Sequence, residues 1–166
     1  MKAALAHIEE HLIATLETVS DPEIPVLTVL DLGVIREATE KNGRIHIKLT
    51  PTYSGCPAMD VIGDDLETAF AKIGMTTKVQ LVLAPAWTTD WISEGGKRKM
   101  EEYGIASPLD ETGDKEVLLG NAKIVKCTNC GSRNTHLGSQ VGSTACKALF
   151  KCDACLETFD YFKCLK

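Results

Sequence analysis

Cys127-Thr128-Asn129-Cys130 and Cys152-Asp153-Ala154-Cys155 are two Cys-x-x-Cys pairs near the end of a 166-residue chain, and 21 residues separate them. Two such pairs can supply four thiolates to a tetrahedral metal shell that has no open position. A segment of about forty residues buries too little apolar surface to fold alone, so a bound metal would replace a large core. We therefore expect a zinc ribbon in which these four cysteines hold a structural Zn²⁺.

The alternative for these cysteines is a set of disulfides in a secreted protein. The first ten residues contain no uninterrupted apolar signal region, and seven cysteines cannot all pair with one another. No stretch approaches the ~20 consecutive apolar residues of a membrane span. These features favour a metal site over disulfides, and they predict a cytoplasmic protein with no membrane association.

Charge is unevenly distributed along the chain. Residues 1–126 hold thirteen Lys and Arg against twenty Asp and Glu, a net charge of −7, whereas residues 127–166 hold five against three, a net charge of +2. Four thiolates around one Zn²⁺ would add −2 to the tail, so no basic surface remains to neutralise several phosphates. We expect no nucleic-acid partner.

The first half of the chain alternates between helical and strand periodicities. Apolar residues at helical spacing predict an amphipathic helix over 5–19, and the two prolines at 22 and 25 predict a shaped loop after it. Two β-type runs, Val34–Glu40 and Arg44–Leu49, flank Asn42-Gly43, a pair suited to the positive φ angles of a tight turn. We expect a β-hairpin here.

The pattern continues beyond the hairpin. Pro57 is suited to the first turn of a helix whose apolar spacing runs to Ile73, and alternation over Val79–Leu83 predicts a third strand. A helix capped near Thr88 is expected to reach Tyr103, and residues 104–120 have the irregular composition of a linker.

Together these elements predict an α/β (α+β) fold in two domains. Residues 1–120 would form a compact α-β-β-α-β-α body, and residues 121–166 a small zinc-ribbon β domain.

Cys56 is the one cysteine outside the tail, and it lies at a predicted helix start. Free N–H groups and the helix dipole favour a thiolate there, so we expect its pKa to fall below the usual ~8.5. Asp21 and Glu23 lie in the proline-shaped loop and would bring carboxylates to the same pocket if the two loops meet. The structural alternative is a small buried thiol at Cys56 and a capping role for Asp21.

Other candidate residues stay open between structural and functional roles. Cys146 and Cys164 are either packed thiols or additional thiols for a second metal or cluster. His136 is a weaker alternative as a zinc ligand, because four well-spaced thiols already complete the shell. Trp87 and Trp91 either fill the core or anchor a partner.

Four segments of the chain, at 21–25, 50–59, 85–92 and 142–164, carry a resemblance to known proteins. They resemble the PaaD family of phenylacetate-degradation proteins, and the match spans nearly the whole chain. The body is also similar to the wider family of small α/β iron-sulfur assembly proteins. The resemblance implies that Asp21, Glu23, Thr50, Thr52 and Cys56 form a pocket that handles iron or a transient iron-sulfur cluster.

The resemblance also implies an accessory role in the multicomponent phenylacetyl-CoA 1,2-epoxidase of aerobic phenylacetate degradation. The expected partners are the oxygenase subunits or their iron-sulfur flavin reductase, and a homodimer is left open. The chain has no dinucleotide fingerprint, no paired Glu-x-x-His helices and no plant-type cluster spacing, so we expect a non-catalytic maturation protein. The alternatives are a stable scaffold component of the epoxidase and a cysteine enzyme that handles thioesters.

Overall fold

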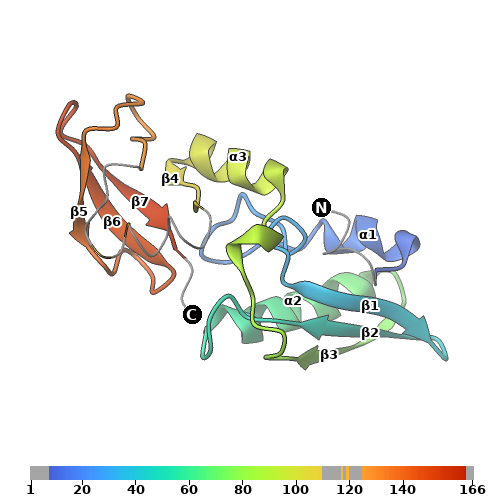
Figure 1. The fold of residues 1–166 in the computed structure, drawn as a ribbon. Helices are drawn as coiled ribbons and strands as arrows, with labels where there is room; N and C mark the ends of the chain where they lie inside the picture. The colour runs from blue at the N-terminus through green and yellow to red at the C-terminus, as the bar shows by residue number, and fades with distance from the viewer. Residues whose placement is uncertain (1–7, 110–116, 118, 120–124, 164–166) are drawn as a thin grey trace. The chain divides into compact units, whose positions relative to one another are not determined.

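The computed structural model describes residues 8–109, 117, 119 and 125–163 of the chain (Figure 1). The chain divides into two compact units. The first contains the residues up to Trp87 together with Trp91–Gly96, and the second contains Thr88–Asp90 together with the residues from Lys97 onward. The mixture of helices with two separate sheets confirms the predicted α+β class.

The first unit is built on a three-stranded sheet with the order β1-β2-β3, in which β1 and β2 are antiparallel and β2 and β3 are parallel. The predicted hairpin is confirmed, because Asn42 and Gly43 connect β1 to β2 with φ angles of 54° and 71°. The elements, in chain order, are α1 (Glu10–Leu16), β1 (Ile35–Lys41), β2 (Arg44–Leu49), α2 (Ala58–Lys72) and β3 (Thr76–Leu81).

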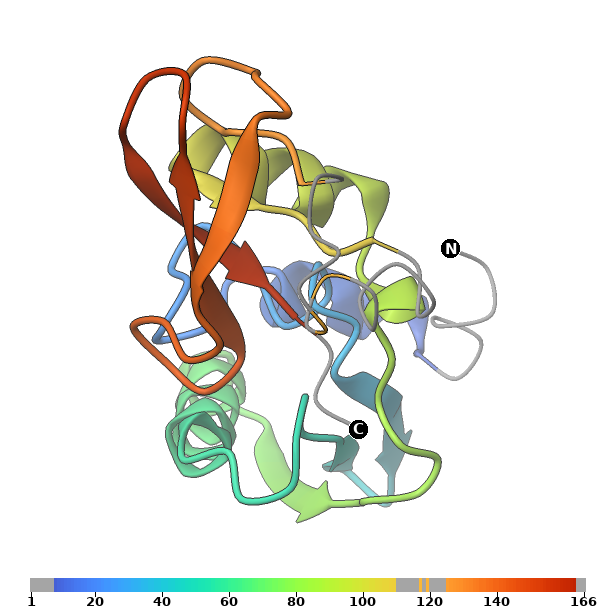
Figure 2. The same cartoon turned by 60° about the vertical axis from the view of Figure 1, so that its left-hand side comes forward.

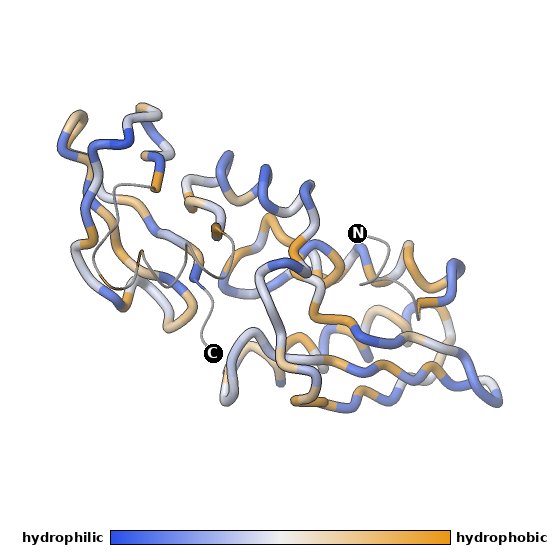
Figure 3. The backbone as a smooth tube through the Cα atoms, viewed as in Figure 1, coloured by the Kyte–Doolittle hydropathy of each residue, from blue (hydrophilic) through white to orange (hydrophobic). Residues whose placement is uncertain are grey.

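Helix α2 covers one face of this sheet (Figures 1 and 2). Its side chains at positions 62, 66 and 70 are fully buried, at the i, i+4, i+8 spacing of a single helix face. Alternate residues of β2, at positions 45, 47 and 49, are buried as well, as expected for a strand with one covered face. The hydropathy colouring of Figure 3 follows the same alternation along the strands.

The first predicted helix is shorter in the structure than in the sequence pattern. Residues 1–7 lie outside the described part of the chain, and Ile8 forms a parallel β-bridge with Ala38 instead of a helical turn. The N–H of Glu9 donates to the carbonyl of Ala38 at 3.1 Å, so the chain is extended until α1 begins at Glu10. The apolar periodicity could not distinguish a helical turn from a β-bridge at Ile8, because an apolar side chain can pack against the core from either conformation.

The helix predicted from Thr88 to Tyr103 is interrupted. A short 3₁₀ turn, η1 (Thr89–Trp91), is followed by α3 (Glu94–Tyr103). The Oγ of Ser93 accepts the N–H of Gly96 at 2.8 Å and donates to the carboxylate of Asp31 at 2.9 Å. A serine that caps the first turn of α3 therefore starts a new helix where the sequence pattern suggested one continuous element.

The second unit contains a four-stranded sheet with the order β4-β7-β6-β5 (Figure 2). Strands β5, β6 and β7 are antiparallel neighbours, and β4 pairs in parallel with β7. The predicted linker was therefore wrong at its start, because the buried Ile105 and Ala106 form a strand of this sheet. The strands are β4 (Ile105–Ala106), β5 (Thr135–Ser139), β6 (Lys147–Cys152) and β7 (Thr158–Phe162).

The core of the second unit is small and aromatic. The ring of Phe150 lies 5.5 Å from that of Tyr161 in an edge-to-face arrangement and 5.8 Å from that of Phe159. Cys127 and Cys152 belong to the same buried cluster. The predicted domain boundary at residue 120 stays a prediction, because residues 120–124 are outside the described part.

Among the residues that the structure describes, none of the helices is both long and apolar enough to cross a membrane.

Candidate functional site

Four cysteine sulfurs converge at one end of the second unit. The Sγ atoms of Cys127, Cys130, Cys152 and Cys155 all lie within 4.8 Å of one another. Cys127 is 3.8 Å from Cys155, and Cys130 is 3.6 Å from Cys152. A tetrahedron with metal–sulfur bonds of ~2.3 Å has sulfur–sulfur edges of ~3.8 Å, so the four donors already have the spacing of a metal shell.

Each Cys-x-x-Cys pair is shaped by the same two backbone hydrogen bonds. The N–H of Gly131 donates to Cys127 O at 3.0 Å, and the N–H of Leu156 donates to Cys152 O at 2.9 Å. Both donors have a positive φ, 74° at Gly131 and 66° at Leu156. The first cysteine of each pair also donates its own N–H to a residue five positions on, which closes the loop. These turns aim both thiols of each pair to one point.

The donor set fits a structural metal ion. Four sulfurs in a tetrahedral arrangement are typical of Zn²⁺ or of iron in thiolate sites, and no position is left open for a substrate. Cys127 and Cys152 are buried, whereas Cys130 is exposed and Cys155 half-buried. A metal here would therefore link the aromatic core of the unit to its surface turns.

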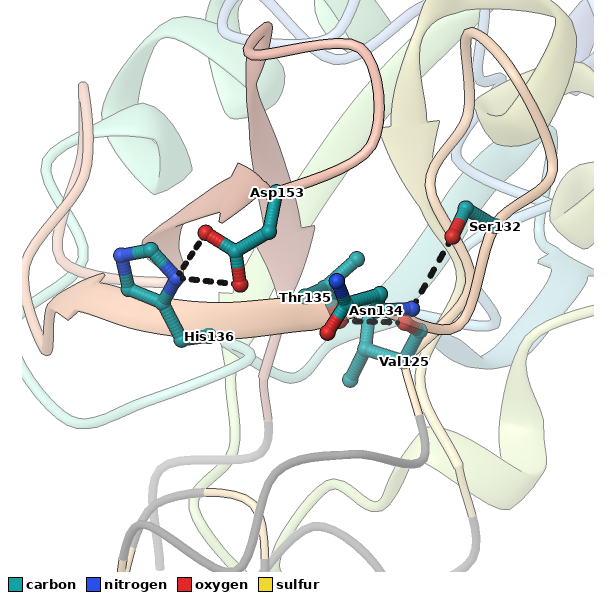
Figure 4. Close-up of polar contacts among 6 residues, drawn as sticks. All are labelled: Val125, Ser132, Asn134, Thr135, His136 and Asp153. Carbon is teal, nitrogen blue, oxygen red and sulfur yellow. Dashed lines mark hydrogen bonds and ion pairs between the residues drawn. The ribbon is translucent and has the colours of Figure 1, made fainter.

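His136 does not join these four sulfurs. It lies on β5, and its Nδ1 is 3.1 Å from both carboxylate oxygens of Asp153 (Figure 4). Two further contacts hold the same region, since Thr135 donates to the carbonyl of Val125 at 2.7 Å and the N–H of Asn134 donates to Ser132 Oγ at 3.0 Å. The imidazole thus contacts Asp153 of the second cysteine turn and lies outside the group of four sulfurs.

Cys56 lies two residues before the first residue of α2, as the sequence predicted. The expected fall of its pKa is wrong: burial of the half-buried thiol raises the pKa. The N–H of Ala58 donates to the sulfur and acts in the opposite direction, but the carboxylates of Glu23 and Asp21 add to the increase. Sequence reasoning counted the helix terminus and left out desolvation and the facing negative charges.

The Asp-Pro-Glu loop and the start of α2 therefore meet closely enough to interact electrostatically. Asp21 is 8% exposed, and its Oδ1 accepts the N–H groups of Glu23 and Ile24, each at 2.8 Å. Asp21 thus caps a turn of the loop and not a helix, because no helix among the described residues begins directly after it, and this role is compatible with an effect on Cys56. The N–H of Asp21 donates to Leu27 O at 2.8 Å, which closes the loop.

The two threonines of the predicted pocket differ in their surroundings. Thr50 is 1% exposed, and its hydroxyl donates to the carbonyl of Val82 at 2.6 Å, so it ties the end of β2 to the segment after β3. Thr52 is half-buried in the turn that leads to Cys56. Tyr53 was not among the predicted pocket residues, yet its side chain hydrogen-bonds to the Cys56 sulfur and lowers the pKa of that thiol. In the sequence, the spacing Tyr-x-x-Cys within one turn is the feature that indicates this contact.

The remaining candidates have structural surroundings. Cys146 is buried with its sulfur 3.0 Å from the hydroxyl of Thr144, whereas Cys164 lies outside the described residues. Trp87 is buried and its indole N–H donates to Leu32 O at 2.9 Å, as the core-filling alternative requires. Trp91 is half-buried, and the guanidinium of Arg36 stacks 3.6 Å from its ring centre.

Two protein-family models match the chain. The PaaD zinc beta ribbon domain matches residues 111–163, and the iron-sulfur cluster assembly protein family matches residues 9–81. The first match contains the four-cysteine cluster, and the second contains Cys56 and the Asp-Pro-Glu loop.

A solved domain of unknown function from Bacillus anthracis, of the DUF59 type, has a similar fold. It is 28% identical, covers 55% of this chain and 90% of its own, and superimposes with a TM-score of 0.51. An Fe-S protein maturation auxiliary factor from Bacillus subtilis, YitW, is 33% identical over 54% of this chain and 90% of its own length.

One relative matches almost the full length of the chain. It is an Escherichia coli (strain K12) protein whose name assigns it to a "Putative 1,2-phenylacetyl-CoA epoxidase" as one of the subunits, and it is 44% identical over 92% of this chain and 90% of its own. It covers both the body and the four-cysteine unit, as the predicted resemblance requires. The chain therefore belongs to the PaaD family, and it joins a match to the iron-sulfur cluster assembly family with a match to the PaaD zinc ribbon.

Proposed function

We propose that this protein is a non-catalytic maturation factor of a phenylacetyl-CoA epoxidase, and that Cys56 transiently holds iron or an iron-sulfur cluster as cargo for the oxygenase subunits or their reductase. The name of the E. coli relative supports the epoxidase system. The names of the shorter relatives, which match about half of this chain, support a role in Fe-S protein maturation.

The observation that carries the proposal is the charge around Cys56. Burial is the largest cause of the raised pKa of the thiol, and the carboxylates of Glu23 and Asp21 raise it further because they oppose a negative charge on the sulfur. The same carboxylates favour a cation, and a bound iron would supply the positive charge that converts the thiol into a thiolate ligand. The pocket is therefore better suited to accept a metal ion than to ionise by itself.

The same charges argue against the thioester enzyme. A cysteine nucleophile needs a lowered pKa or an adjacent base, whereas the pKa of Cys56 is raised and none of the groups that shift it is a histidine. An oxyanion formed during acyl transfer would also lie beside two carboxylates, and this would destabilise it.

We further propose that Zn²⁺ is the metal of the four-cysteine cluster and that its role is structural. The supporting observation is the arrangement of four sulfurs within 4.8 Å of one another around a closed shell. Such a site stabilises a small domain and leaves no coordination position for chemistry.

The test is co-expression of the epoxidase oxygenase and reductase with wild-type protein, Cys56→Ser or Cys146→Ser, followed by anaerobic purification. We expect Cys56→Ser to give clients with less iron and acid-labile sulfide and lower epoxidase activity, while the variant keeps its own zinc. Cys146→Ser is the matched control, since Cys146 is also a described cysteine outside the four-cysteine cluster.

Two outcomes would overturn the proposal. Clients with full metal content and full activity in the presence of Cys56→Ser would show that the thiol is not needed for maturation. In the second outcome, the epoxidase loses activity only when this protein is absent altogether, and the two copurify in a fixed ratio. This protein would then be a stable scaffold component of the epoxidase complex.

A further inference from the structure

β3 is the outer strand of the first sheet. Among the residues that the structure describes, no strand other than β2 pairs with it. The N–H of Val82 donates to Leu49 O, and its carbonyl accepts from the hydroxyl of Thr50. Both backbone groups of Val82 therefore point toward β2. Because these groups alternate along a strand, those of Thr77, Val79 and Leu81 point to the free edge. This edge can accept another strand.

β3 carries one feature that opposes strand addition, the exposed charge of Lys78, but it contains no proline and its pairing with β2 has no register shift. Natural edge strands are protected by charges, prolines or bulges. Here Leu81 is 52% exposed, and Leu83, just beyond the strand, is 60% exposed. The hydrophobic stretch at the end of β3 is visible in Figure 3. An exposed apolar edge of this kind is typical of an interaction surface.

Helix α2 forms a wall beside this edge. A Cβ added at Gly63 of α2 would lie 4.0 Å from a methyl group of Val79, so the Val79 side chain faces α2. Because side chains alternate along a strand, Thr77 and Leu81 face the same side. Between the helix and the strand lies an open groove of about 760 Å³. Its lining includes Asp64, Glu67, Thr68 and Ala71 from α2 and Thr76 and Thr77 from β3.

Two properties of the groove indicate what would occupy it. Asp64 and Glu67 make its helical side acidic, and the only basic residue of α2 is Lys72 at its end. The backbone groups of Thr77, Val79 and Leu81 point to the open edge, where no other strand of the described residues pairs with β3. An extended segment with basic side chains would complement both the charge and the open backbone groups.

A second copy of this chain fits the edge less well. If two β3 strands paired antiparallel about a two-fold axis, both α2 helices would lie on the same face of the joined sheet. The Asp64 and Glu67 side chains of one copy would then approach those of the other, and like charges across an interface oppose association. The acidic wall thus selects against self-pairing.

We propose that the free edge of β3 and the acidic wall of α2 bind an extended basic segment of a partner protein by strand addition. This surface does not include Cys56, so the inference goes beyond the proposed function and stands whether the protein is a maturation factor or a scaffold. It assigns the partner's chemistry: alternating basic and apolar side chains in an extended conformation.

The test is an NMR titration of the ¹⁵N-labelled full-length protein with an eight-residue peptide of alternating valine and lysine. We expect saturable shifts at the amides of Thr77, Val79 and Leu81, slower amide exchange along β3, and no comparable effect from a valine–glutamate peptide. Failure of the valine–lysine peptide to saturate at millimolar concentration would overturn the proposal.

Two matched variants sharpen the test. Asp64→Lys should weaken binding about fivefold, because it reverses a charge in the groove, whereas Asp65→Lys makes the same change on α2 outside the groove lining and should have less effect. Leu81→Pro removes an edge N–H and should abolish binding, whereas Leu81→Thr retains that N–H and should bind more weakly. Equal losses in both aspartate variants, or β3-dependent dimers without peptide, would contradict the proposal.

Discussion

The four-cysteine cluster and Cys56 place thiols at turns in two different electrostatic settings. In the cluster, sulfurs from two turns lie 3.6 to 3.8 Å apart, so a metal ion bound there would help to hold the unit together. Cys56 lies at the start of α2 near two carboxylates, in a unit with its own buried aliphatic core. Removal of a cluster thiol should therefore destabilise its unit, whereas removal of Cys56, the thiol that we propose holds a cargo, should leave the fold intact.

The largest expected effect is that of Cys152→Ser. Cys152 is fully buried in the aromatic core of the second unit, and metal-binding free energy at such sites is of order 10 kcal/mol and is also folding free energy. We expect the variant to lose its metal and the amide signals of β5, β6 and β7 to lose their dispersion. Cys56→Ser is the comparison, and it should leave both units folded. Dispersed β5–β7 signals in a metal-free Cys152→Ser protein would contradict this expectation.

The contrast also explains what the sequence could and could not predict. The cysteine spacing sufficed for the cluster, because a Cys-x-x-Cys turn fixes its own geometry over four residues. Asn42-Gly43 likewise determined the hairpin. The pKa of Cys56 could not be predicted in the same way, since its direction depends on burial and on Glu23, more than thirty positions earlier in the chain. Local patterns predict local geometry, whereas long-range electrostatics requires the fold.

The same limit applies to secondary-structure boundaries. Ile8 continues the helical spacing of α1, yet its backbone pairs with Ala38, a residue of a distant strand. Ile105 and Ala106 have too short an apolar pattern to indicate a strand, but they pair with β7, more than fifty residues later. In each case a tertiary contact decides between conformations that the local sequence leaves nearly equal in free energy.

A smaller effect is expected from the two turns within the cluster. Gly131 and Leu156 occupy equivalent positive-φ positions, but only the first is glycine. Gly131→Ala should destabilise the second unit by about 1–2 kcal/mol, because an L-residue is strained there. A Cβ would also lie 3.3 Å from the flexible Cε of Lys126, which can move away. Leu156→Gly should relieve the strain of the other turn and stabilise the unit by at most about 1 kcal/mol, since glycine also gains entropy in the unfolded chain.

Thermal unfolding at a fixed zinc concentration would measure both changes. Gly138→Ala is the control, because Gly138 lies in the strand β5 without a positive φ, and its added Cβ would lie 3.4 Å from Leu149 O. Equal effects of alanine at Gly131 and Gly138 would show that the left-handed turn is not a source of strain. A destabilising Leu156→Gly would show that the exposed leucine side chain contributes more than its backbone costs.

The smallest expected effect concerns the pKa of Cys56. Removal of the Glu23 charge by Glu23→Gln takes away one cause that raises this pKa, so the pKa should fall, although burial keeps it above the ordinary value. At a fixed pH below the pKa, the fraction of thiolate and hence the rate of alkylation by iodoacetamide should rise. The rate would be followed from pH 7 to 10 by mass spectrometry of the peptide that contains Cys56. Glu17→Gln removes an exposed carboxylate that is not among the groups affecting Cys56, and its profile should match the wild type. If Glu23→Gln left the profile unchanged, or slowed alkylation, the negative charge of the loop would not act on the thiol, and the electrostatic preference of this pocket for a cation would lose its support.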